Sequence, residues 1–429
     1  MKTMKVALLA TAALAAVSVS ARADDTAAIK AQLEALTARI AQLEAAPAAP
    51  IGFSLLTISE GQATKVPGLD VTDKSYSDTA TIIGIMPTAD APASTTIEWS
   101  GYVRAALVYH DYEVDDPNED SINDDDLSVK ARGQLKVVGK TDTAVGEVGV
   151  QIQLRAQAWE VDSNSTVVSN EAWGWWAMTP EVTFGGGFTG SLGNVGYGYD
   201  GACTCGYIDN ADVYTNPGDA LQLRLSWASG PISVAVALED ATGGNAFSEN
   251  GEDGDEDHAD GLGVAAEIKY SGDTVSGEIS AVWREGDDYG EAPHLGGDTH
   301  TVLGSDSYVL GAGLGFALGD MASLSLAANV GQTNYDADFW NVNALLSANL
   351  SDSVRAELGA GYKSYDDADF VPERDTWAVM AGLYYEPVAQ LTLGLEAEYS
   401  ETEQDHLNPA NGTRTAEEMT IDFVTWWRF

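Results

Sequence analysis

The sequence predicts an all-β transmembrane protein, a sixteen-stranded antiparallel β-barrel of the outer-membrane type preceded by a short coiled-coil helix. Three observations support this fold class. Apolar and polar residues alternate in segments of about ten residues, and the connections between these segments are alternately short and long. Beyond the N-terminus no stretch is apolar enough for a spanning helix, and only helices and closed barrels satisfy every backbone group in lipid.

Residues 1–23 predict a cleaved signal peptide. Lys2 and Lys5 precede an apolar run at residues 6–19, and residues 21–23 (ARA) then form an A-x-A cleavage site. A transmembrane helix is the alternative, but it needs about 20 apolar residues and has no processing site. We therefore expect the mature chain to begin at Asp24 and to be exported.

Residues 24–46 predict a coiled-coil segment. The register puts Leu33 and Ile40 at a, and the charged e and g positions favour a parallel partner; a single amphipathic helix on another surface is the alternative. About three heptads are marginal alone, and a trimer of barrels would raise their local concentration, so we expect a homotrimer. The apolar residues that recur at steps of four and three are Ile29, Leu33, Leu36, Ile40 and Leu43.

Residues 47–96 predict a periplasmic linker or collar. Pro47 and Pro50 end the helix, and apolar stretches at residues 53–58 and 81–86 flank a polar segment. Two arrangements remain open for these stretches: a small hairpin at the periplasmic rim, or entry into the barrel.

Residues 97–429 predict the barrel. In the first segment, Trp99 and Val103 share one face, whereas Glu98 and Arg104 share the other. A soluble antiparallel sandwich would alternate too, but the count of segments is even, as bacterial barrels require. The segments start near residues 97, 127, 144, 171, 182, 220, 231, 262, 274, 307, 322, 339, 353, 376, 390 and 418.

The connections and the aromatic residues fit a membrane barrel. Tight turns at residues 179–181, 229–231 and 271–273 separate long polar loops, like the periplasmic turns and external loops of outer-membrane barrels. The strand from Trp99 to Tyr109 would span roughly 23 Å of membrane at a tilt near 45°. Further aromatic residues that we expect at the two membrane interfaces are Trp227, Tyr270, Trp283, Tyr362, Trp377, Tyr385, Tyr399 and Trp427.

The last segment alternates strictly and ends at Phe429. With this segment and the opening residues 100–104 (SGYVR), the chain resembles the outer-membrane porins of alphaproteobacteria over residues 97–429. The resemblance implies a water-filled channel for passive diffusion in the bacterial outer membrane, and it makes Phe429 the assembly signal for the barrel-insertion machinery. Residues 24–96 depart from the plainest members of that family and are similar to envelope proteins that reach towards the cell wall.

The resemblance also implies a constriction. In such porins the third loop folds into the barrel and narrows it, and the glycine-rich residues 185–218 follow the fifth segment here; a long external loop is the alternative. Inward-facing bases would stand across from this loop, although Lys136 could sit near a rim in solvent. We expect the constriction to comprise Arg104, Lys130, Arg132, Lys136, Arg155, Arg224, Asp200, Asp209, Asp212 and Asp219.

The charge balance bears on the partners. The formal net charge is −45, which makes nucleic acid an unsuitable partner, whereas outer-membrane lipid and lipopolysaccharide are expected neighbours. Most acid lies in the long loops and would concentrate cations, so we expect a weak cation preference. The acidic segments include residues 115–126, 252–260, 285–288 and 366–369.

Metal, cofactor and enzyme signals are weak. No cofactor is expected; the acidic loops would offer oxygen ligands to Ca²⁺, but none matches an EF-hand. No metal site is predicted, because Cys203 and Cys205 are too few for zinc and the histidines are scattered; the two cysteines could be bonded or free. An enzyme is not expected. A hydrolase needs a nucleophile beside a positioned His, and no His lies in the middle of a predicted strand on its inward face in such company.

Two other functions remain open. A solute-specific channel of the same architecture is one, favoured only weakly by inward aromatic residues at Tyr102, Trp159 and Trp426. The other is a structural envelope protein whose coiled coil tethers the outer membrane to the cell wall, and it does not exclude a channel.

Overall fold

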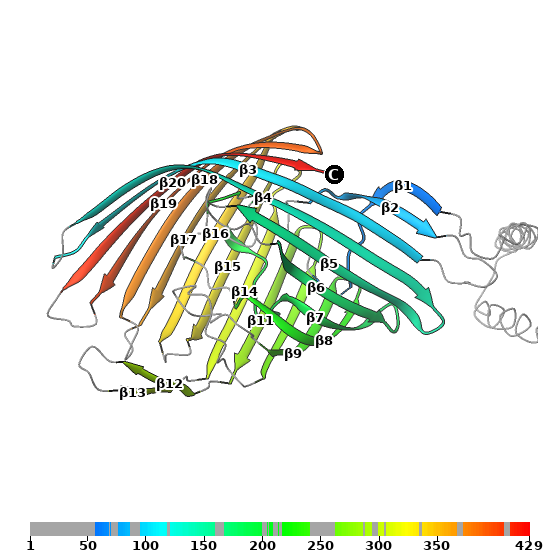
Figure 1. Ribbon diagram of the computed structural model, residues 1–429, viewed down its shortest axis with the longest axis horizontal. Helices are drawn as coiled ribbons and strands as arrows, with labels where there is room; N and C mark the ends of the chain where they lie inside the picture. Colours follow the sequence, from blue (N-terminus) through cyan, green and yellow to red (C-terminus); the bar gives the residue numbers. More distant parts are fainter. Residues whose placement is uncertain are drawn as a thin grey trace, which may run out of the picture. The chain divides into compact units, whose positions relative to one another are not determined.

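The computed structural model describes the barrel and the segment that leads into it (Figure 1). Among the described residues, no helix is both long enough and apolar enough to span a membrane. The predicted signal peptide and coiled coil lie outside the described residues, which are 56–67, 69, 76–85, 95–117, 121–158, 167–199, 204, 206–208, 213, 217–240, 262–285, 288–293, 299–303, 306–333, 337–366, 372–406 and 412–429.

The described elements are β-strands. The first half comprises β1 (Leu56–Gln62), β2 (Thr79–Ile85), β3 (Thr95–Asp115), β4 (Ile122–Thr143), β5 (Gly146–Ala158), β6 (Val167–Ala177), β7 (Val182–Gly190), β8 (Asp219–Ser229), β9 (Ile232–Asp240) and β10 (Gly263–Ser271). The second half comprises β11 (Val275–Arg284), β12 (Asp288–Pro293), β13 (Thr299–Leu303), β14 (Ser307–Ala317), β15 (Ala322–Gln332), β16 (Asp338–Ser351), β17 (Val354–Tyr365), β18 (Arg374–Val388), β19 (Leu391–Asp405) and β20 (Thr413–Arg428).

Sixteen of these strands, β3–β11 and β14–β20, form one closed antiparallel barrel. Each strand pairs with the next along the chain, and β20 closes the ring on β3 with Ile421 opposite Tyr109 and Trp427 opposite Val103. The predicted barrel fold is therefore confirmed. One expected loop differs, because residues 288–303 contain the separate two-stranded sheet β12–β13.

Most strands start within two residues of the predicted positions, and the exceptions have a common cause. β4, β6 and β20 begin at Ile122, Val167 and Thr413, earlier than the predicted 127, 171 and 418. The first five residues of β4 are exposed, yet they pair with β3, with Val114 opposite Ile122. The backbone ladder continues beyond the apolar band, where alternation of side-chain polarity no longer marks it.

The alternation sorts side chains into two faces. On β5, the apolar Val150 and Ile152 are about half exposed, whereas Gln151 and Gln153 between them are buried. The apolar face is therefore outside, where lipid would cover it, and the polar face is inside. The expected interfacial residues Trp227, Trp283, Trp377 and Trp427 are among the exposed ones.

The N-terminal hairpin β1–β2 extends the barrel wall at the rim that carries the tight turns. β2 pairs with β3 where β20 has ended: Thr81 lies opposite Trp99, whereas Arg428 lies opposite Tyr102 (Figure 1). We call this rim periplasmic, because short turns face the periplasm in such barrels. Thr64, which lies between β1 and β2, contacts the inward-facing Glu98. Both arrangements that the sequence left open are therefore present: β1 and β2 form a hairpin at the rim, and the residue that lies between them enters the barrel.

Candidate functional site

Five of the six predicted bases lie on one sector of the inner wall. Arg104 on β3 is directly opposite Arg132 on β4, and Ala106 is opposite Lys130. Gln134, two residues after Arg132, is opposite Arg155 on β5. We call Arg104, Lys130, Arg132, Lys136 and Arg155 the basic sector. Arg224, on β8, is separated from this sector by β6 and β7.

Three members of the basic sector are open to solvent inside the barrel. Lys130, Arg132 and Arg155 are each partly exposed, although they share the inward face with buried residues such as Gln134. The Arg155 side chain is positioned by a hydrogen bond from its Nε to Oε1 of Gln134, at 3.1 Å. A partly exposed charge on an inward face requires solvent-accessible space within the barrel.

Arg104 is covered by aromatic side chains, and its part in a constriction stays a prediction. Only 5% of it is exposed, and its guanidinium carbon lies 4.3 Å from the ring centroid of Tyr207 and 5.9 Å from that of Trp426. The Tyr207 hydroxyl donates to the Arg104 carbonyl oxygen at 3.3 Å. Burial raises the pKa of the Tyr207 phenol, and the positive charge of Arg104 opposes this rise. Cation–π stacking stabilises the desolvated guanidinium.

Lys136 and Arg224 are also covered. Lys136 is 6% exposed, with its Nζ 4.0 Å from the ring centroid of Tyr76, so it does not sit in solvent at a rim. Arg224 donates through Nη2 to the Gly190 carbonyl oxygen at 3.0 Å and lies over the ring of Trp173. These side chains hold segments together and do not present charge to a solute.

The described residues of the connection between β7 and β8 lie on the inner wall. We call residues 191–218 the inner loop, which the structure describes at residues 191–199, 204, 206–208, 213 and 217–218. Its backbone amides donate hydrogen bonds to side chains of the wall. The acceptors are Glu239 on β9 for Leu192, Glu278 on β11 for Gly196 and Asn343 on β16 for Tyr199. The loop thus follows the wall around the side of the barrel that the basic sector leaves free.

The acids that anchor the inner loop were not identified from the sequence. The Thr204 amide and hydroxyl donate to Glu357 on β17 at 2.7 and 2.8 Å, and the Gly206 amide donates to Glu396 on β19. Buried glutamates accept these bonds because a loop without regular structure leaves its amides unpaired. The signal was present: each of these glutamates occupies an inward position of its alternating strand, as the buried Glu239 and Glu396 do.

The predicted acids of the constriction are placed only in part. Asp200, Asp209 and Asp212 lie outside the described residues. Asp219 is the first residue of β8 and is exposed, in the alternation of the outward-facing Leu221, whereas Ala220 and Gln222 are buried. The positive charge of Arg155 on the inner wall nevertheless acts on the Asp219 carboxylate, so the place of Asp219 opposite the bases stays a prediction.

Within the residues that the structure describes, no group of three or more His, Cys, Asp or Glu side chains could hold a metal ion. Cys203 and Cys205 lie outside this part of the chain.

Comparisons with known proteins agree with this architecture. A family model described as a porin subfamily matches residues 92–425. The outer membrane channel DcaP of Acinetobacter baumannii is 16% identical, with 78% of this chain and 97% of that chain covered at a TM-score of 0.56. The anion-selective porin from Comamonas acidovorans is 12% identical, with 78% and 100% covered at 0.53, and OmpT of Vibrio cholerae is 11% identical, with 78% and 98% covered at 0.52. These similarities show the fold, and no curated protein matches the sequence.

Proposed function

Since the chain belongs to the porin subfamily, we propose that it forms a water-filled channel for the passive diffusion of ions and small hydrophilic solutes. The protein is a channel of the bacterial outer membrane, and family and fold indicate a channel and not an enzyme. Outer-membrane lipid and lipopolysaccharide would contact its apolar outer face, and the barrel-insertion machinery would recognise the strand that ends at Phe429.

One observation carries this proposal: Lys130, Arg132 and Arg155 are inward-facing and still partly exposed. Charged side chains on the inner wall keep a lumen hydrated, and a hydrated lumen conducts. The inner loop contacts the wall from β9 to β19, so it supports a narrowing of the lumen on the side away from these bases. Single-channel recording in planar bilayers tests the function directly; purified folded barrel that produces no conductance steps would contradict it.

We also propose a weak preference for cations. The net charge of −45 is concentrated in the long loops, and Arg104, Lys136 and Arg224 are covered, so part of the basic charge does not reach the solution. Reversal potentials in a KCl gradient should favour K⁺. The preference should weaken from 0.1 M to 1 M salt, because the screening length falls from about 10 Å to about 3 Å. Reversal potentials that favour Cl⁻ would reject this part of the proposal.

The heptad pattern at residues 24–46 supports a homotrimer held partly by a parallel coiled coil. The purified protein should migrate as a heat-modifiable trimer, and light scattering in mild detergent should give the trimer mass. Ile40→Asp, which places a charge at an a position, should weaken the trimer more than Ala35→Asp on the outer face of the same helix. A stable wild-type monomer would contradict the proposal.

The same heptad pattern supports a second function, a tether between the outer membrane and the cell wall. Isolated cell-wall sacculi should retain the full-length protein and release a variant that lacks residues 24–46. Equal retention of both proteins, or of neither, would leave the channel as the only function.

A further inference from the structure

A short segment of the N-terminal hairpin lies inside the barrel. We call residues 63–67, 69 and 76–78, between β1 and β2, the rim insert. Its two arms are joined at the base by a hydrogen bond from the Ala63 amide to the Asp78 carbonyl oxygen at 2.8 Å, which continues the β1–β2 ladder. The insert is therefore held by a regular hairpin and not by a free end of the chain.

The first arm docks on a pair of charged residues at the rim. The Thr64 amide donates to Oε2 of Glu98 at 2.7 Å, and Nζ of Lys140 donates to the Thr64 hydroxyl at 2.6 Å. Lys140 also lies 3.7 Å from Oε1 of Glu98. Glu98 is only 4% exposed. The insert therefore donates a hydrogen bond to a carboxylate that it also shields from solvent.

The next residue of this arm that faces the wall is apolar. Val66 is 2% exposed and packs with Val138, Trp173 and Trp175, which belong to β4 and β6. Burial of these apolar side chains against one another stabilises the docked arm. The insert thus spans the inner wall from β3 to β6.

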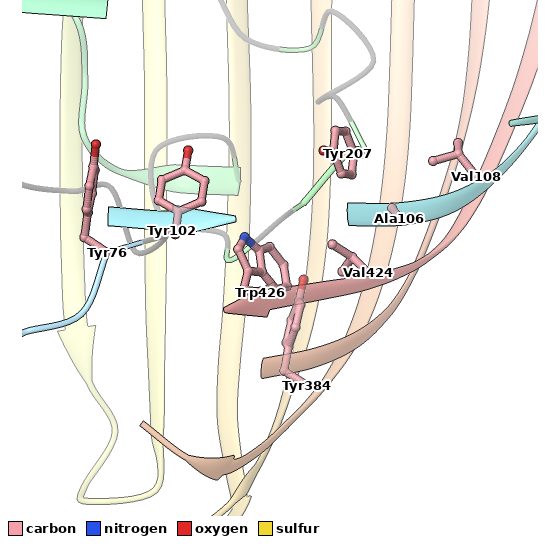
Figure 2. Packing of buried hydrophobic residues seen from close by; sticks show 8 residues of the cluster. All are labelled: Tyr76, Tyr102, Ala106, Val108, Tyr207, Tyr384, Val424 and Trp426. Carbon is pink, nitrogen blue, oxygen red and sulfur yellow. The ribbon is translucent and has the colours of Figure 1, made fainter. Parts of the chain in front are cut away.

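The second arm reaches the basic sector. The Tyr76 ring lies 4.0 Å from Nζ of Lys136 and edge-on to the Tyr102 ring at 5.2 Å, and its hydroxyl donates to Oε1 of Gln153 at 3.2 Å. Figure 2 shows Tyr76 beside Tyr102 in the same cluster as Tyr207 and Trp426. From Lys140 to Lys136 the contacts rise four residues along β4, which at about 3.3 Å per residue and a tilt near 40° is roughly 10 Å of depth.

We propose that the rim insert is a second selectivity element of the channel, which narrows the periplasmic half of the lumen and withholds the Lys136 charge from permeating ions. This inference rests on the proposed channel function. Tyr76 of the rim insert packs against Tyr102 of β3. Tyr207 of the inner loop covers Arg104, two residues further along the same strand, so the two elements cover neighbouring inward positions. Together they leave Lys130, Arg132 and Arg155 as the partly exposed bases of the basic sector.

The decisive variant replaces residues 63–78 with Asn-Gly, which suits a two-residue turn because Gln62 and Thr79 are directly opposite in the ladder. Its single-channel conductance should rise at least roughly 1.5-fold, and its reversal potential should shift towards anions, since pore width and lining charge govern both. Larger polyethylene glycols should then enter from the periplasmic side.

Three further variants separate the causes. Lys136→Gln added to the deletion should cancel the shift in reversal potential and keep the higher conductance. Tyr76→Ala in the full-length chain uncovers Lys136 without removing any backbone. It should therefore also shift the reversal potential towards anions. Ile58→Ser is the matched control, because Ile58 lies on the same hairpin and is 74% exposed; it should change neither property.

Heat-modifiable migration confirms that each variant is folded before recording. A folded deletion variant with the conductance, reversal potential and polymer exclusion of the wild type would overturn the inference while the channel function stands. If the wild-type barrel itself does not conduct, both the proposed channel function and this inference fail. If the deletion variant does not fold, Tyr76→Ala decides: an unchanged reversal potential rejects the role assigned to Lys136.

Discussion

The backbone amide of Gly206 donates to both carboxylate oxygens of Glu396, at 2.8 Å each. Gly206 belongs to the inner loop, whereas Glu396 lies on β19 of the wall and is 0% exposed. The bond places a non-repetitive segment against the inner face at one fixed point. Glu239, Glu278 and Glu357 provide similar points, so a row of wall glutamates holds the described part of the loop against the inner wall.

Replacement of Glu396 should loosen the inner loop. Glu396→Leu removes the acceptor of the Gly206 amide, and each buried polar group left without a partner costs about 1–3 kcal/mol. We expect noisier open-channel current and a less uniform conductance, with partial recovery in Glu396→Gln, which keeps one acceptor oxygen. Glu181→Gln, at an exposed periplasmic turn, is the control. Equally quiet currents in all of these proteins would contradict the anchoring role.

Gly206 itself should tolerate no side chain. A Cβ atom there would lie 2.8 Å from Cγ2 of Val424 and 3.2 Å from the Trp426 ring, which is closer than ordinary contact. Gly206→Val should therefore displace the loop and reproduce the noise of Glu396→Leu. Gly133→Ala is the control, because a Cβ atom there would meet no atom within 4 Å other than those of its chain neighbours. A quiet Gly206→Val channel would mean that the loop adjusts without losing its anchor.

The open bases should limit the cation preference. Arg132→Gln combined with Arg155→Gln removes two partly exposed positive charges from the inner wall, and it leaves the acidic loops unchanged. The reversal potential at 0.1 M KCl should move further towards K⁺, and this effect should be small at 1 M because of screening. Arg414→Gln, on an exposed part of β20, should change it less. An unchanged double variant would show that these two side chains do not face the ion path.

The carboxyl terminus should matter for barrel closure. Phe429 and Gly101 exchange two backbone hydrogen bonds at 3.0 and 3.1 Å, and the Phe429 ring fills the space beside Gly101. Deletion of Phe429 should lower the yield of folded barrel far more than Asp257→Asn in the connection between β9 and β10, as measured by heat-modifiable migration.

A second variant probes the same contact. A Cβ atom at Gly101 would lie 2.7 Å from both the Phe429 ring and the Gln134 carbonyl oxygen, so Gly101→Val should also lower the yield. Equal yields of folded barrel for wild type, Phe429 deletion and Gly101→Val would show that this contact is dispensable for assembly.

The sequence predicted the barrel well and the site only in part. Alternation along β3 assigned Trp99 and Val103 to one face and Glu98 and Arg104 to the other, and the structure agrees, since the first two are exposed and the last two are buried. The place of Asp219 was predicted from loop composition and not from this alternation, and it stays a prediction. The wall glutamates could have been found by extending the parity argument to β9, β11, β17 and β19, since an inward carboxylate needs partners.

The sequence by itself determined strand number, strand order and the face of most side chains, because these follow from a period of two and from connections between neighbours. Only the tertiary structure decided which inward bases meet solution. Exposure of Arg104 depends on Tyr207, and that of Lys136 depends on Tyr76; both aromatic residues lie far away in sequence on segments without strand periodicity. Contacts of such segments are set by the closure of the barrel around them, which no local pattern encodes.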